Sequence, residues 1–186
     1  KSEYKYAKDH PVINVSGRVI GTLINADNDG KHVLPTHLIV CGKPIDDEQF
    51  IKKIKDRFVI EKKTSVSGLV SEMDNCRTLD TINLGVLTRS GNAYLLRYKG
   101  EENWSSDLST ASQVLDVNVL HQLILKPACG IDTRNQHDLG HLAYVRGNEP
   151  PLEMIKNISD YDFVFFVNPP NLDQIFDLAE TGETMP

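Results

Sequence analysis

The sequence has few cysteines and no long hydrophobic run. Its 186 residues include three cysteines, at positions 41, 76 and 129. An odd number of widely spaced cysteines predicts neither a disulfide framework nor a CxxC-type zinc or redox site. No apolar run approaches the roughly 20 residues that cross a bilayer, and the first residues, KSEYKYAKDH, lack the apolar core of a signal peptide. These absences favour a cytoplasmic chain without a membrane segment.

The motifs of common nucleotide-binding and hydrolytic sites are also missing. The sequence has no GxxxxGK[ST] loop, no GxGxxG after a strand and no GxSxG elbow. His137 and His141 are spaced like two zinc ligands, but Asp138 stands where a helical metalloprotease needs Glu. A solvated loop is the preferred interpretation, and no metal site is predicted there.

The charge balance argues against a partner with a phosphate backbone. The chain has 20 Lys and Arg against 26 Asp and Glu, a formal charge of −6, so nucleic acid is not the expected partner. Basic residues between positions 52 and 63 alternate with apolar ones as on an amphipathic helix, which favours a solvated face. A hydrophobic content of 40% is sufficient for one domain core without disulfide or metal staples, and two small lobes remain an alternative.

The first hundred residues predict an α+β lobe with two hairpins and one helix. β-Branched apolar runs interrupted by turn residues predict strands, and apolar residues at positions 50, 51, 54 and 58 predict a helix capped by Asp46. Pro35 marks an edge, a bulge or a break in its strand. The expected strands are Arg18–Ala26, His32–Cys41 and the hairpin pair Ile82–Thr88 and Ala93–Tyr98.

Residues 113–186 predict a helix-rich α/β segment, after a polar linker at Gly100–Ser112. Its expected strand, Phe163–Val167, is apolar throughout and therefore buried on both faces. The expected helices are Asp116–Leu125, capped by Asp116 and ended by Pro127 and Gly130; Pro151–Asn157; and Asn171–Glu180, closed by Gly182. The fold class is α+β, with a mixed or antiparallel sheet and several amphipathic helices, either in two parts or as one compact domain.

Two further histidines lie in apolar surroundings. His37 lies at the end of an extended run, and His121 lies within a strongly apolar helical segment. A buried imidazole is usually hydrogen-bonded for structural reasons. That interpretation is preferred for both residues over a role as ligand or proton carrier.

Several blocks of the chain, in order, resemble one bacterial family. The blocks are LINADNDGKHVLPTHLIV at Leu23–Val40, DRFVIE at Asp56–Glu61, LDVNVLHQLILKPACGID at Leu115–Asp132, AYVRGNE at Ala143–Glu149 and FVFFVNPPNLDQIFDLAETGETMP at Phe163–Pro186. They resemble the domain of unknown function 1015 family, whose members are sometimes labelled ParB-like or putative phosphatases. The chain departs from the family at Leu38, where members usually have Arg, and at Pro170, where they tend to have Thr.

The resemblance implies that this chain is the C-terminal part of a longer protein. Family members carry a DGHHR-type segment upstream, and they continue after Met-Pro with a Lys-Ser-Thr stretch. The DGHHR-type segment is similar to one in ParB-like partition proteins and in relatives that phosphorylate free serine. The resemblance therefore implies nucleotide-dependent phosphoryl transfer to a small molecule in the complete protein, with ATP or ADP and magnesium as cofactors.

The polar residues in the matched blocks that could bind a ligand are His37, Arg146 and Asn168. Arg146 followed by Gly147 would let a guanidinium and an open backbone approach a phosphate together, although a surface or interlobe salt bridge for Arg146 is at least as strong an alternative. No catalytic residue is assigned. The competing function is a non-catalytic module that packs against the N-terminal part of the same protein, binds a partner or forms a homodimer.

Overall fold

The fold was analysed in a computed structural model, which describes residues 33–76, 81–100, 104–147 and 160–185. Residues 32–186 form one compact unit. The strand expected at Arg18–Ala26 and the helix expected at Pro151–Asn157 lie outside the described residues.

The unit is built on a six-stranded sheet in the order β2-β4-β3-β6-β1-β5. Every neighbouring pair is antiparallel, which confirms the α+β class and selects the antiparallel arrangement over the mixed one. The strands are β1 (Thr36–Val40), β2 (Phe58–Lys63), β3 (Asn83–Thr88), β4 (Ala93–Tyr98), β5 (Leu142–Arg146) and β6 (Phe163–Phe166).

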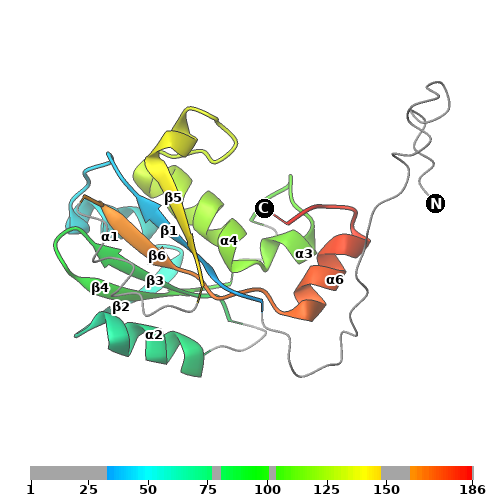
Figure 1. The fold of residues 1–186 in the computed structure, drawn as a ribbon, viewed down its shortest axis with the longest axis horizontal. Helices are drawn as coiled ribbons and strands as arrows, with labels where there is room; N and C mark the ends of the chain where they lie inside the picture. The colour runs from blue at the N-terminus through cyan, green and yellow to red at the C-terminus, as the bar shows by residue number, and fades with distance from the viewer. Residues whose placement is uncertain (1–32, 77–80, 101–103, 148–159, 186) are drawn as a thin grey trace. The chain divides into compact units, whose positions relative to one another are not determined.

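Helices cover both faces of this sheet (Figure 1). On one face α1 and η3 enclose the larger apolar core, and on the other face α2 encloses the smaller one. The helices are α1 (Asp47–Ile54), α2 (Val66–Asn75), α3 (Thr110–Gln113), α4 (Asp116–Val119), the π-helix η3 (Leu120–Cys129), the 3-10 helix η4 (Asp138–His141) and α6 (Leu172–Glu180). Among the described residues, no helix could span a membrane.

Three predicted elements are confirmed closely. The hairpin forms as β3 and β4, and its turn contains Gly91 at φ 79°, a left-handed conformation that glycine adopts easily. Strand β6 is buried along its whole length. Helix α6 starts at a capping box, in which the Asn171 side chain and Gln174 each accept the other's backbone N–H.

Strand β1 begins directly after Pro35 and is paired on both sides. It lies between β5 and β6, and β6 in turn lies between β1 and β3. The residues before and after the expected linker at Gly100–Ser112 therefore contribute strands to the same sheet.

The first predicted helix is shorter than its apolar spacing indicated. Asp46 caps it as expected, accepting from the Gln49 N–H at 2.8 Å, but α1 ends at Ile54. Phe58 opens strand β2 and lies opposite Tyr98 of β4, with ring centroids 5.6 Å apart. The expectation that Phe58 extends the helix was wrong, because a β-sheet partner far along the chain decides its conformation.

The helix expected at Asp116–Leu125 also differs. Asp116 is the first residue of α4 and Leu115 occupies the cap position, so the predicted capping role of Asp116 is wrong. From Leu120 the helix widens to a π-helix that includes Pro127 and ends at Gly130, at φ 67°. The Lys53 ammonium of α1 donates to the Ala128 carbonyl at 2.9 Å, so a tertiary contact satisfies the last turn beyond the proline.

A carboxylate at the start of α1 ties this helix to the β3–β4 hairpin. The side chains of Thr88 and Ser90 (each 3.1 Å), Asn92 (2.6 Å) and Tyr94 (3.2 Å) all donate hydrogen bonds to the Asp47 carboxylate. Partial burial raises the pKa of Asp47, but these four donors outweigh that effect, and its net pKa lies below the ordinary value.

The Asp47→Asn variant should therefore lose stability in a pH-dependent way. Because the folded-state pKa is depressed, the stabilisation is complete above the ordinary pKa and is lost as the pH falls through the folded-state pKa. We expect the variant to be about 1–2 kcal/mol less stable at pH 7, from weakened hydrogen bonds to a charged group. Urea unfolding across a pH series would measure this difference.

The control is Glu48→Gln, which changes an exposed acidic residue of the same helical turn. It should alter the free energy of unfolding by less than about 0.5 kcal/mol. If the difference in the free energy of unfolding between wild type and Asp47→Asn stays constant down to strongly acidic pH, the ionised Asp47 carboxylate is not the source of the stabilisation.

Candidate functional site

A pocket opens at the end of the sheet where β1 begins and β6 ends. Its volume is about 260 Å³, and it lies on the face of the sheet covered by η3. Most of its wall is apolar. The lining residues are Leu34, Thr36, Leu38, Leu115, Asp116, Val117, Leu120, His121, Tyr144, Val167, Asn168, Pro169, Pro170, Gln174 and Met185.

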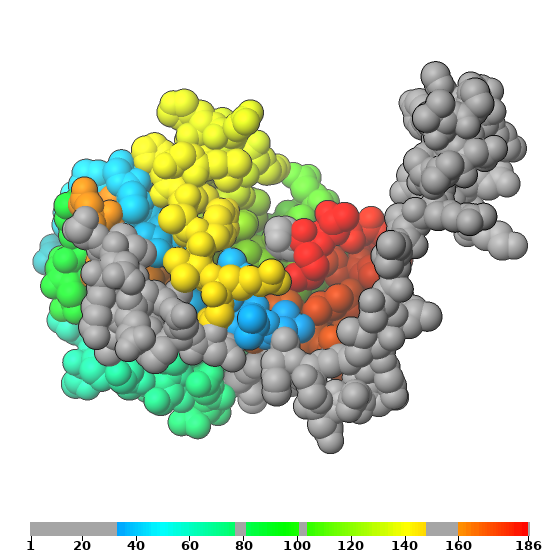
Figure 2. Space-filling model, in the orientation of Figure 1, coloured from blue at the N-terminus to red at the C-terminus, as the bar shows by residue number. Residues whose placement is uncertain are grey.

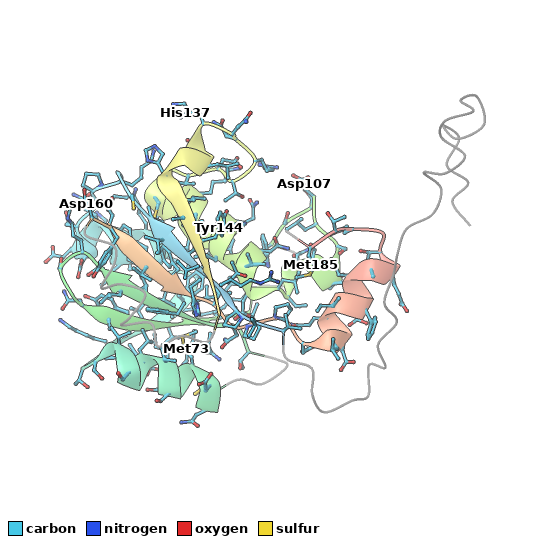
Figure 3. The ribbon with its side chains drawn as sticks, viewed as in Figure 1. Met73, Asp107, His137, Tyr144, Asp160 and Met185 are labelled. Carbon is cyan, nitrogen blue, oxygen red and sulfur yellow. The ribbon has the colours of Figure 1, made fainter. Side chains whose placement is uncertain are left out.

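Four parts of the chain that are distant in sequence meet here. Thr36 starts β1, Asn168 follows β6, Asp116 starts α4 and Gln174 lies in the first turn of α6. On the face toward the viewer in Figure 2, the blue of the chain at the start of β1, the yellow of β5 and the red C-terminal segment come together. Figure 3 labels Tyr144 on β5 and Met185 near the C-terminus, two of the lining residues.

Hydrogen bonds fix the polar wall of the pocket. The Asn168 amide donates to the Asp116 carboxylate at 3.0 Å and to the Asn83 carbonyl at 2.9 Å. The capping box holds Gln174, whose amide also donates to the Val114 carbonyl at 3.4 Å. The carboxylate and the two amides are therefore positioned by the fold before any ligand binds.

His121 contributes a neutral, deeply buried imidazole to the same wall. The ring is 9% exposed, its Nδ1 lies 3.4 Å from the Thr133 hydroxyl, and burial lowers the pKa of His121 to about 4. Its Nε2 is buried and has no hydrogen-bond partner among the described residues. The preferred structural role of His121 thus accounts for one ring nitrogen and leaves the other unexplained.

The helical geometry changes where the chain passes the pocket. Regular α4 ends at Val119, and the π-helix begins at Leu120 and His121, which both line the pocket. π-Helical turns are rare and are frequent at functional sites. The change in winding, the buried imidazole and the hydrogen-bonded carboxylate thus occur together at one place.

Large apolar side chains remain exposed around the pocket. Leu34, Tyr144 and Met185 are 41%, 52% and 40% exposed, and all three line it. Partial burial raises the pKa of Tyr144, so its phenol stays protonated at neutral pH. Exposed apolar groups that surround a concave surface are typical of a binding site.

The three residues predicted to bind a ligand are placed differently. Asn168 lines the pocket. Arg146 lies opposite Thr36 in the β1–β5 ladder, so its side chain projects from the same face of the sheet as Thr36. His37 is on the opposite face, 8% exposed, edge-on to Phe166 with centroids 5.5 Å apart. The three residues therefore do not converge on one point.

His37 and Arg146 also differ in their partners. The Val167 N–H donates to His37 Nδ1 at 3.3 Å, and burial lowers the pKa of His37, so this ring is neutral and packed. The Arg146 guanidinium is exposed and has no hydrogen-bond or ion-pair partner within the described ranges. The alternative role for Arg146 was a salt bridge. In the part of the chain that the structure describes, no acidic side chain pairs with it.

Sequence reasoning missed Asp116 as a member of this site. It was interpreted as a helix cap, and its partner Asn168 is 52 positions away, so no local pattern connects them. Thr36, Tyr144 and Gln174 were missed for the same reason. The one available signal was that Asn168 is a polar residue two positions after a fully buried strand.

Within the described residues, no group of three or more His, Cys, Asp or Glu side chains could hold a metal ion. The three cysteines, Cys41, Cys76 and Cys129, are free thiols. Comparison of the chain with models of known protein families, with curated proteins and with solved structures gives no match.

Proposed function

We propose that the pocket binds a small organic molecule and that, in the longer protein implied by the family resemblance, this molecule undergoes nucleotide-dependent phosphoryl transfer. Two observations carry the proposal: the pocket itself, and Arg146, which projects from the same face of the sheet and has no partner among the described residues. A mostly apolar pocket with a few positioned polar groups is the usual form of a small-molecule site. The free thiols fit a reducing compartment, and we propose the cytoplasm.

The positions of the charged side chains indicate which residues bind phosphate and which orient the molecule in the pocket. Phosphoryl transfer needs positive charge and a metal ion around phosphate oxygens and a group that orients the acceptor. Arg146 is exposed on the same face of the sheet as the pocket. Its guanidinium can form a bidentate pair of hydrogen bonds with a phosphate. Asp116 and Asn168 orient the molecule in the pocket. ATP or ADP with magnesium is the proposed cofactor.

Replacing Arg146 by alanine should weaken nucleotide binding and leave the fold intact. In the longer protein, a saturating ATP–magnesium or ADP–magnesium complex should stabilise the wild type by about 2.7 kcal/mol at a hundred times its Kd. The Arg146→Ala variant should show a shift smaller by at least half, because a charge-assisted contact to phosphate is lost. Thermal unfolding with and without nucleotide measures both values.

The matched control is Lys62→Ala, which removes an exposed positive charge from β2, at the opposite edge of the sheet from β5. It should leave the nucleotide shift unchanged. The absence of any shift in the longer protein, or an unaltered shift in Arg146→Ala, would refute this role. The same measurement on the present chain shows whether residues 1–186 contain enough of the nucleotide site.

The second candidate is a non-catalytic module that packs against the N-terminal part of the same protein or forms a homodimer. It is favoured by apolar side chains exposed outside the pocket: Val59 on the edge strand β2 is 48% exposed and Phe176 on α6 is 51% exposed. Sedimentation at several protein concentrations tests it. A dimer that dissociates in Val59→Lys or Phe176→Lys would favour the module, and a monomer at all concentrations would exclude the homodimer.

A further inference from the structure

We infer that the pocket binds a small, uncharged, apolar alcohol, whose hydroxyl donates a hydrogen bond to the side-chain carbonyl oxygen of Asn168. This inference rests on the proposed function, in which the pocket holds the molecule that is acted on. It goes further by fixing the charge, the polar group and the size of that molecule. The orientation of the Asn168 amide, the charges of the lining and the apolar wall each point to this class of ligand.

The Asn168 amide is held in one orientation. Its Nδ2 group donates one hydrogen bond to the Asn83 carbonyl at 2.9 Å and another to the Asp116 carboxylate at 3.0 Å. An amide nitrogen carries two hydrogens, so both are used. A flipped amide would turn Oδ1 toward two oxygen acceptors, and the two contacts therefore fix which side of the amide carries the oxygen.

The oxygen of that amide is left as an open hydrogen-bond acceptor. Asn168 Oδ1 has no hydrogen-bond partner within the described residues and, unlike His121 Nε2, it is not buried. Because Asn168 lines the pocket, a ligand there meets an acceptor that the fold already holds in place. Such an acceptor is matched by a hydroxyl of the ligand, and a hydroxyl is also the group that kinases phosphorylate.

The described residues of the lining offer no charge that is available to a ligand. No lysine or arginine is among them, and burial keeps His121 neutral, with a pKa of about 4. The Asp116 carboxylate accepts from Asn168 and has a further interaction of its own, so it is already engaged. A charged ligand would lose its hydration here without gaining a free partner of opposite charge, which favours an uncharged ligand.

The rest of the wall is suited to an apolar body of modest size. Leu38, Leu120 and Val167 line the pocket and are 2%, 1% and 5% exposed, so the deep part of the wall is aliphatic. The volume, about 260 Å³, exceeds the roughly 150 Å³ cavity that holds benzene. It lies below the roughly 300–1,000 Å³ of drug-sized sites. A single six-membered ring with a short substituent matches this space.

The inference is tested by two matched series of probes that differ in the polar group. One series is cyclohexanol, cyclohexanone, cyclohexylamine and cyclohexanecarboxylate, and the other is 1-phenylethanol, acetophenone, 1-phenylethylamine and 2-phenylpropanoate. Each probe is titrated at pH 7 into this chain, and the amide NMR signals of Val117, Val167 and Gln174 are followed.

The comparison of alcohol with ketone isolates the donated hydrogen bond, because the two molecules have nearly the same size and only the alcohol can donate. We expect each alcohol to bind about five-fold more tightly than its ketone, the effect of one net hydrogen bond. It should bind about ten-fold more tightly than the amine or the carboxylate, which enter as ions. A ketone that binds as tightly as its alcohol, or an ion that binds most tightly, would overturn the inference.

The Asn168→Ala variant should lower the affinity for each alcohol to that for its ketone and leave the ketone affinity unchanged. A general disturbance of the pocket would instead weaken both probes. The control is Asn75→Ala, which removes an exposed asparagine at the end of α2, outside the pocket lining, and should keep the alcohol preference. An alcohol preference that persists in Asn168→Ala would show that Asn168 is not the acceptor and would refute the assignment.

Failure of this inference is distinguishable from failure of the proposed function. If no probe in either series shifts the three signals, the alcohol assignment is wrong, whatever nucleotide does to the longer protein. If the alcohols bind as expected and nucleotide causes no stabilisation, phosphoryl transfer is wrong and the alcohol site stands. The order of affinities in the wild-type chain decides the ligand class should Asn168→Ala fail to fold.

Discussion

The Phe50→Ala variant should lose about 3–5 kcal/mol of stability, the range found for truncating a buried aromatic side chain. Phe50 of α1 is 0% exposed, and its ring centroid lies 4.8 Å from that of Phe163 and 6.1 Å from that of Phe165. These rings join α1 to the middle of the sheet. Alanine leaves a cavity between two elements that are fixed by other contacts and cannot collapse to fill it.

For a domain of this size the loss corresponds to a fall in Tm of roughly 10 °C. The control is Phe176→Ala, in which an equally large side chain on α6, 51% exposed, is removed. It should change the free energy of unfolding by about 0.5 kcal/mol or less. Comparable losses in the two variants, measured by urea unfolding, would contradict the placement of the core between α1 and β6.

The Arg89→Ala variant should cost about 2–3 kcal/mol, although Arg89 is 59% exposed. Its guanidinium donates at 3.0 Å to the carboxylate of Asp162, which is only 3% exposed. Without Arg89, that buried carboxylate retains one donor among the described residues, the Lys43 N–H at 2.6 Å. The cost lies below the roughly 3–5 kcal/mol for breaking a fully buried pair, because solvent screens the arginine side.

Two variants separate this buried contact from the exposed one that Arg89 makes with Asp160, at 2.5 Å. Asp160→Asn should cost less than about 1 kcal/mol, since Asp160 is 77% exposed. Adding Asp162→Asn to Arg89→Ala should restore part of the stability, because the double variant buries no unpaired charge. If Asp160→Asn costs as much as Arg89→Ala, or if the double variant is the least stable, the buried carboxylate is not the cause.

Local patterns in the sequence predicted the elements whose conformation depends on neighbouring residues. The Asp46 cap, the hairpin around Gly91 and the capping of α6 by Asn171 formed where they were expected. Each is decided within a few residues, by a side chain that binds a nearby N–H or by a backbone angle that glycine permits. The continuous apolar run of β6 predicted burial on both faces, and β6 lies between two strands.

The same reasoning failed where distant residues compete with local preference. Phe58 fits the spacing of α1, yet it lies in β2 because pairing with β4 and ring contact with Tyr98 outweigh helical periodicity. Pro127 would normally end a helix, but the π-helix continues past it to a carbonyl bound by Lys53. Tyr98 is far from Phe58 in sequence, and Lys53 is far from Ala128, so no local pattern could have indicated either contact.

The sequence by itself determined the fold class and most of the regular elements, and it singled out Asn168, which lies in the lining of the pocket. The tertiary structure alone decided the strand order, with β6 between β1 and β3, and so brought Asn168 to Asp116 and placed His121 in the same wall. It also placed the side chain of His37 on one face of the sheet and the side chain of Thr36 on the other. Thr36 lies opposite Arg146 in the β1–β5 ladder. Side chains alternate between faces along a strand, so residues adjacent in sequence separate and residues far apart converge.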